Sequence, residues 1–153
     1  MIAFLVEANK FLYRFPDNVI VKDTPSGDMK IIEHCRDNFI YRNYFVGYRS
    51  LTGKVLILQN AKPIWVLTYE GGVTNHEDSD DCVRRIYAFV RRNLARATLD
   101  QPIRGPSEYH DGKMCYNNSF FGSINKFNGN ETVSLSDQRL IYSLSYSGGD
   151  VIF

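Results

Sequence analysis

The residues best suited to binding chemistry form two copies of a tyrosine, one intervening residue and a glycine pair. The copies are Tyr69-Glu70-Gly71-Gly72 and Tyr146-Ser147-Gly148-Gly149. Glycine pairs allow positive φ and close backbone approach, which suits a bulge or a sharp turn. Their backbone N–H groups can also form a small anion-binding nest beside the tyrosine hydroxyl. A structural role and a binding role are both open, and no Lys-Ser/Thr follows as in a phosphate-binding loop.

A single arginine, Arg104, stands in a stiff segment between Pro102 and Pro106. Such a loop could present the guanidinium as a two-pronged clamp for a carboxylate or a phosphate. The same group could instead form a salt bridge that pins the crossing between two parts of the chain. The sequence leaves both alternatives open.

Glu131 is the carboxylate that we consider for general acid or base catalysis. The corresponding position in the other copy is Val55, so an apolar residue is tolerated at that place. An asymmetric carboxylate can mark a function, although a solvent-exposed glutamate on a strand is more common. No nucleophile motif accompanies Glu131, and an enzyme is therefore only an alternative.

Histidines and cysteines are scattered: His34, His76, His110, Cys35, Cys82 and Cys115. None shows the spacing of metal ligands, so we expect no metal site and no cofactor. The odd number of cysteines favours a reducing compartment. We expect Cys82 and Cys115 to be buried thiols rather than nucleophiles.

Composition indicates one globular domain spanning residues 1–153. The chain is 44% hydrophobic and 23% charged, with a net charge of +1. A charge this small provides no field for nucleic acid or an anionic membrane. The first residues resemble no signal peptide, and no window reaches the roughly 20 apolar residues of a membrane span. We therefore expect a cytoplasmic protein that binds neither nucleic acid nor a membrane.

The elements that must position these residues are strands in two similar halves. Matching motifs predict an internal repeat, approximately residues 37–73 and 114–151. A short helix is expected over 2–13, ended by Pro16, and a long amphipathic helix over 80–98. Neighbouring strands with few helices favour an α+β domain of two antiparallel meanders. The apolar end, residues 151–153, is expected to pair or pack.

If the halves meet, their motifs should border one pocket for a small polar or anionic ligand. Aromatic residues would form its walls and Arg104 its charged anchor. The predicted lining is Trp65, Tyr69, Gly71, Gly72, Arg104, Tyr142, Tyr146, Gly148 and Gly149. A protein partner or a homodimer through an exposed sheet edge is the alternative.

The order of these motifs resembles a bacterial family of unknown function. The resemblance rests on the paired Tyr-x-Gly-Gly segments, the loop at 102–106 and the segment from 127 to 133. Members of that family stand alone or follow an N-terminal helix-turn-helix regulator, which implies a sensing role. The resemblance implies a Glu in the first half where this chain has Val55 and an Asp near Asn43; if those carboxylates matter, the first-half site is altered or lost in this chain.

Overall fold

The structure is a computed structural model that describes residues 1–15 and 20–153. Pro16, the predicted end of the first helix, lies outside these residues. The elements run in the order α1 (Ile2–Tyr13), β1 (Lys22–Asp23), β2 (Lys30–Arg36), β3 (Phe39–Gly47), β4 (Ser50–Gln59), β5 (Lys62–Val73), α2 (Asp80–Leu94), β6 (Glu108–Asp111), β7 (Met114–Ser123), β8 (Lys126–Leu135) and β9 (Leu140–Asp150).

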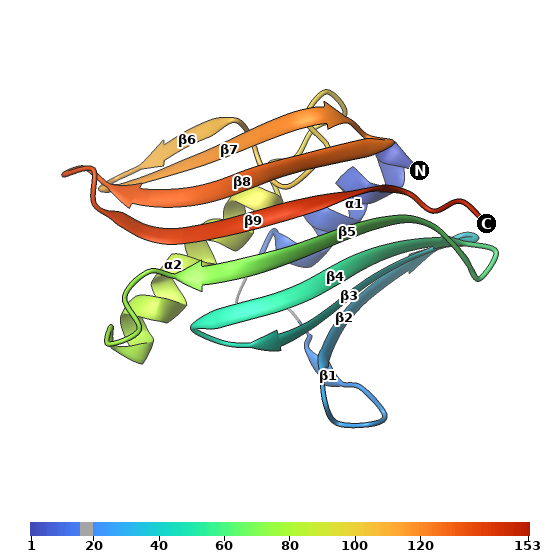
Figure 1. The fold of residues 1–153 in the computed structure, drawn as a ribbon, viewed down its shortest axis with the longest axis horizontal. Coiled ribbons are helices and arrows are strands. Elements are labelled where there is room, and N and C mark those ends of the chain that lie inside the picture. Colours follow the sequence, from blue (N-terminus) through green and yellow to red (C-terminus); the bar gives the residue numbers. More distant parts are fainter. Residues whose placement is uncertain (16–19) are drawn as a thin grey trace.

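All the strands join one antiparallel sheet in the order β1-β2-β3-β4-β5-β9-β8-β7-β6. Strands β1 to β5 form one meander and β6 to β9 form the other, and they meet where β5 pairs with β9 (Figure 1). The predicted α+β class, with a short N-terminal helix and a long helix between two meanders, is confirmed.

Both helices pack on the same face of the sheet, where the apolar core lies (Figure 1). Helix α2 begins at Ser79, whose hydroxyl accepts a hydrogen bond from Cys82 N at 3.3 Å. Aspartates follow in its first turn, where negative charge complements the helix dipole. The apolar stripe of α2 is buried: Val83, Ile86, Phe89, Val90 and Leu94. This stripe joins the apolar core between the helices and the sheet.

The central pairing of β5 and β9 places the two motif tyrosines opposite one another. Tyr69 faces Tyr146, Trp65 faces Asp150, and Val73 faces Tyr142. Both tyrosine rings lie on the inner face, and each covers a glycine of the neighbouring strand. A Cβ on Gly129 would lie 2.3 Å from the Tyr146 hydroxyl, and one on Gly53 would lie 2.5 Å from the Tyr69 hydroxyl. The inner face therefore requires glycine beneath each tyrosine.

Two local predictions are wrong, the second of them only in part. Helix α2 ends at Leu94 rather than near residue 98, because the chain turns there to reach the Arg104 loop. At the C-terminus Val151 pairs as predicted, its N–H donating to the Ile64 carbonyl oxygen at 3.0 Å, but Ile152 and Phe153 are 90% and 96% exposed and do not pack. Among the described residues, no helix is both long and apolar enough to span a bilayer.

Candidate functional site

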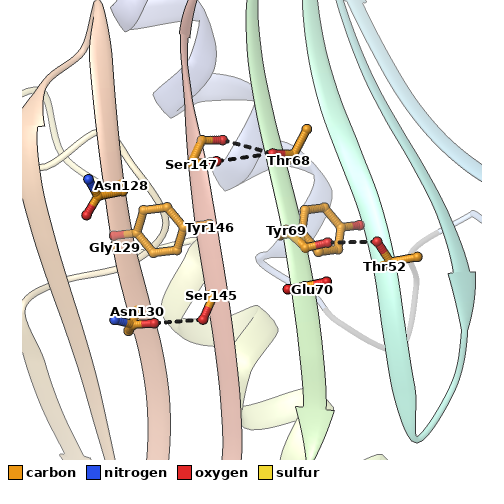
Figure 2. Close-up of a pocket in the computed structure, with 10 residues that line it drawn as sticks. All are labelled: Thr52, Thr68, Tyr69, Glu70, Asn128, Gly129, Asn130, Ser145, Tyr146 and Ser147. Atoms are coloured by element: carbon orange, nitrogen blue, oxygen red, sulfur yellow. Dashed lines mark hydrogen bonds between the residues drawn. The ribbon is translucent and has the colours of Figure 1, made fainter.

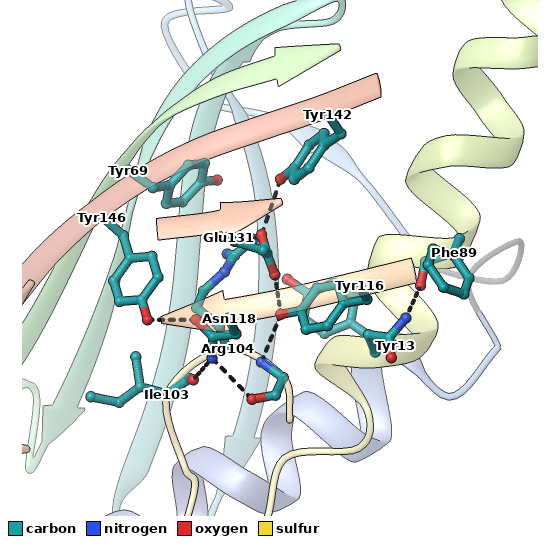
Figure 3. Close-up of polar contacts among 12 residues, drawn as sticks. Tyr13, Tyr69, Phe89, Ile103, Arg104, Tyr116, Asn118, Glu131, Tyr142 and Tyr146 are labelled. Atoms are coloured by element: carbon teal, nitrogen blue, oxygen red, sulfur yellow. Dashed lines mark hydrogen bonds and ion pairs between the residues drawn. The ribbon is translucent and has the colours of Figure 1, made fainter. Parts of the chain in front are cut away.

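Glu131 on β8 is the centre of a buried polar network (Figure 3). Its side chain has no exposed area, which excludes the solvent-facing position that is usual for a glutamate on a strand. Its carboxylate accepts hydrogen bonds from the hydroxyl of Tyr116 at 2.5 Å and from that of Tyr142 at 3.1 Å. The third donor is the guanidinium of Arg104, which forms an ion pair with Glu131. Arg104 was expected either to clamp a ligand anion or to form a salt bridge within the chain, and the structure contains the salt bridge.

Arg104 is held in an unusual backbone conformation, with φ of +64° in the left-handed region. Asn118 fixes the loop by donating to the carbonyl oxygens of Ile103 and Gly105, each at 3.0 Å. The backbone N–H of Gly105 donates to the Tyr116 hydroxyl at 3.1 Å. The guanidinium thus enters the core from a loop that is fastened to β7.

Each paired tyrosine donates a hydrogen bond to an asparagine. The hydroxyl of Tyr69 donates to Asn43 Oδ1 at 2.7 Å, and the hydroxyl of Tyr146 donates to Asn118 Oδ1 at 2.6 Å. Asn43 in turn donates to the hydroxyl of Tyr13 on α1 at 3.2 Å. The two halves therefore carry similar polar clusters, and only the second includes a carboxylate.

Burial determines the protonation of these groups. Burial raises the pKa of Tyr69, Tyr142 and Tyr146 well above that of a free tyrosine, so their hydroxyls remain neutral donors. Burial alone would lower the pKa of Arg104. The Glu131 carboxylate outweighs that effect and holds the Arg104 pKa well above its usual range.

A cleft of about 70 Å³ lies between α2 and the inner face of the sheet. We call it the α2 cleft. Its polar lining consists of Tyr13, Asn43, Tyr69, Tyr87, Arg91, Arg104 and Tyr142. Its apolar lining comes from Ile32, Phe45, Leu51, Val90, Leu94 and Leu144. The cleft therefore brings two guanidinium groups and four tyrosines into an otherwise apolar space.

Arg91 and Tyr87 contribute to the α2 cleft from one face of α2, because residues four apart share a side of a helix. The sequence placed Arg91 on the solvent side of this helix, whereas its side chain is only partly exposed. Tyr87 donates to the carbonyl oxygen of Tyr48 at 2.7 Å, which links α2 to the β3–β4 turn. Burial raises the pKa of Tyr87 to about 12.

The outer face of the sheet carries a second, shallow hollow of about 390 Å³. It lies across β4, β5, β9 and β8 and is lined mainly by small polar side chains (Figure 2). Thr68 contacts Ser147 across the central pairing at 3.4 Å, and Ser145 donates to Asn130 at 2.8 Å. Glu70 is the charged residue of this lining, so the hollow is ill suited to an anion.

The predicted site residues fall into three groups. Tyr69, Arg104 and Tyr142 line the α2 cleft. Trp65 and Tyr146 lie in the core, with exposed fractions of 0% and 3%, and Trp65 Nε1 donates to Ile124 O at 2.8 Å. The glycine pairs line neither the cleft nor the outer hollow: Gly71, Gly72, Gly148 and Gly149. Added Cβ atoms there would lie 2.1–2.2 Å from backbone oxygens of an adjacent strand or of the turn beside it.

Sequence reasoning missed Asn118, Tyr116 and Arg91 as site residues, and noted Asn43 only as a departure from the resembled family. Extending the internal comparison would have identified the two asparagines, since both precede a glycine by four residues, at Gly47 and at Gly122. Arg91 gives no such signal, because its position depends on how α2 docks on the sheet. The cysteines also differ from expectation: Cys82 and Cys115 are partly exposed rather than buried.

Fold and site together define a two-layer α+β domain with a charged cluster enclosed between its sheet and its helices. Residues 43–151 match the family described as a domain of unknown function, DUF5680. The chain belongs to this family. Its placement in an uncharacterised domain family is therefore confirmed. No curated protein and no solved structure matches the chain.

Proposed function

We propose that this protein is a small-molecule-binding or regulatory module that takes a small polar or anionic ligand in the α2 cleft. The observation that carries the proposal is the meeting of Tyr69, Arg104 and Tyr142 in one cleft, opposite Arg91 of the helix. These residues come from four separate elements. The cleft lies on the inner side of the central pairing, between the two predicted repeats.

The charges of the lining favour an anion. Arg91 and Arg104 are its charged residues, and Glu131 lies behind it, enclosed by its own three donors. The Nε of Arg104 is buried and has no hydrogen-bond partner among the described residues. A buried donor without a partner costs about 1–3 kcal/mol, which an accepting ligand atom would recover.

The size of the cleft limits the ligand. A volume of about 70 Å³ accommodates a few water molecules or one small anionic group such as a carboxylate or phosphate. The neutral tyrosine hydroxyls can supply further hydrogen bonds to such a group. A larger ligand would have to extend out past Arg91 at the side of α2.

The two alternative functions receive less support. Glu131 as a general acid or base would need contact with a substrate, yet its carboxylate is enclosed on all sides. Association through an exposed sheet edge would begin at β1 or β6, which are only 2 and 4 residues long. Parts of β2 and β7 extend beyond these short strands, so edge pairing stays the alternative.

Native mass spectrometry of gently purified protein tests the proposal. We expect an excess mass over the denatured chain, and we expect that excess to disappear in Arg91→Gln. The matched control is Arg92→Gln, which removes an exposed arginine next to it on the same helix and should retain the excess. Arg91 is preferred to Arg104 because loss of Arg104 leaves a buried carboxylate unpaired.

Inorganic phosphate and acetate provide a second readout that does not depend on a copurified ligand. Either anion at about 100 times its dissociation constant should stabilise the fold by about 2.7 kcal/mol, measured as a rise in Tm. The rise should be lost in Arg91→Gln and kept in Arg92→Gln. Equal responses of both variants to the anions, with no excess mass in the wild type, would overturn the α2 cleft as the site.

A further inference from the structure

The hairpin β6–β7 brings together three side chains that are dispersed in the sequence. Its two-residue turn, Gly112-Lys113, pairs His110 with Cys115 across the strands. Glu108 lies two residues before His110 and therefore points to the same face of the sheet. Sequence spacing hides this arrangement, because the His and the Cys belong to different strands.

The donor atoms of these three residues converge. The Cys115 Sγ lies 3.5 Å from His110 Nε2, and the Glu108 carboxylate contacts the same nitrogen. All three ligand atoms lie within 4.8 Å of one another. With Zn–S near 2.3 Å and Zn–N near 2.0–2.1 Å, two ligands at the tetrahedral angle are about 3.5 Å apart. The sulfur-to-nitrogen distance therefore matches that of two ligands of one zinc ion.

The geometry differs from that of a Cys-His-Glu catalytic triad. A triad needs the thiol at one ring nitrogen and the acid at the other, so that the acid orients the imidazole. Here Sγ and Oε1 both face Nε2 of His110. Convergence on one side of the ring suits a shared cation rather than a proton relay.

Neither packing nor folding explains the cluster. The side chains of His110 and Glu108 are 64% and 60% exposed, so they contribute little to the core. The β2–β3 hairpin has the same two-residue turn length, and its second pair from the turn is Cys35 with Ile40. A hairpin at this place in the sheet thus forms without a His–Cys pair.

We propose that the β6–β7 hairpin binds one divalent transition-metal ion, zinc by its ligand chemistry, through Glu108 Oε1, His110 Nε2 and Cys115 Sγ. Three protein ligands leave a fourth tetrahedral position for water or another donor. Asn117 donates to Cys115 Sγ at 3.2 Å, a contact that orients the sulfur. The Glu108 side chain has to swing away from the imidazole to admit the ion, and its exposure permits this.

Cobalt titration of the full, chelator-treated chain tests the site. We expect one Co²⁺ per chain, with a thiolate-to-cobalt charge-transfer band that Zn²⁺ abolishes by displacement. Cys115→Ser should lose the band. His110→Gln and Glu108→Gln should each weaken metal binding by about tenfold or more. Cys35→Ser, which removes the exposed cysteine of the β2–β3 hairpin, should leave the titration unchanged.

The variants alter partly or fully exposed side chains, so their circular dichroism and Tm should match those of the wild type. Absence of a band in the wild type would overturn the proposal. So would a band that survives in Cys115→Ser, or one that His110→Gln and Glu108→Gln leave unchanged, since the thiol alone would then bind cobalt. The α2 cleft plays no part in this test, and either proposal can fail without the other.

Discussion

At the scale of single residues, the ion pair of Arg104 and Glu131 is almost completely buried. The Arg104 side chain is 11% exposed and that of Glu131 is fully buried. Removing two charges from water costs several kcal/mol per ion, so such a pair is a weak source of stability. Removing either partner alone, however, destabilises the fold, because the other charge is left buried without its partner. Val55 stands where the first half would place the carboxylate, which shows that the sheet can be built without one.

A double-mutant cycle measures this coupling. We expect Glu131→Gln and Arg104→Met each to lower the free energy of unfolding by about 3–5 kcal/mol, because each leaves a buried charge unpaired. The double variant Arg104→Met/Glu131→Gln should be more stable than the sum of the single losses by about 1–3 kcal/mol. Urea unfolding followed by circular dichroism provides the values. Additive losses would show that the pair is not coupled.

At the scale of elements, the fold depends on tyrosines packed over glycines in the neighbouring strand. Gly53 and Gly129 occupy the same place in the two meanders, each directly opposite its tyrosine in the register. Contact between ring and backbone leaves no room for even a methyl group. The position of each ring then fixes the asparagine to which its hydroxyl donates.

Gly129→Ala tests that dependence. The new Cβ would lie 2.3 Å from both the Tyr146 hydroxyl and the Ser119 carbonyl oxygen. The backbone oxygen cannot rotate away, so we expect a loss of about 1–3 kcal/mol in unfolding free energy, as for overpacked cores. Asn128→Ala, one residue away on the exposed face, is the control and should stay within about 0.5 kcal/mol. A wild-type Tm for Gly129→Ala would contradict the packing.

The elements were predictable where periodicity was strong, and their ends were not. The apolar stripe of the second helix predicted α2 from Asp80 onward, whereas the glycine pairs, expected at a bulge or a sharp turn, lie within β5 and β9. Arg104 and Glu131 were each identified separately. Nothing local reveals that they form a pair, because 27 positions separate them and the contact depends on how a loop docks on β7.

At the scale of the whole molecule, six tyrosines stand out because burial is the main cause that raises their pKa: Tyr41, Tyr69, Tyr87, Tyr116, Tyr142 and Tyr146. They come from both meanders and from α2. The folded state therefore holds protons that the unfolded chain would release at about pH 10. High pH therefore favours the unfolded chain through tyrosines from all parts of the core.

Stability should consequently fall in alkali. Because the folded pKa values exceed the unfolded ones, the stabilisation is complete below about pH 10 and is lost as the pH rises towards the folded values. Each tyrosine that is ionised only in the unfolded chain lowers the free energy of unfolding by about 1.4 kcal/mol per pH unit. Tyrosinate absorbance and circular dichroism should change together, in one transition. Tyrosinate formation in a protein that keeps its circular dichroism would contradict this expectation.

The pattern of residue pairs between β5 and β9 is the pattern found at the interface of a twofold symmetric dimer. Residue 65 faces 150 and 73 faces 142, while Tyr69 faces its own counterpart, Tyr146. In a twofold interface residue i meets j while j meets i, and the residues nearest the axis meet themselves. Two halves on separate chains would pair only above a certain protein concentration. Because the segment that contains α2 links β5 to the second meander, the pairing of β5 and β9 is intramolecular and does not weaken on dilution.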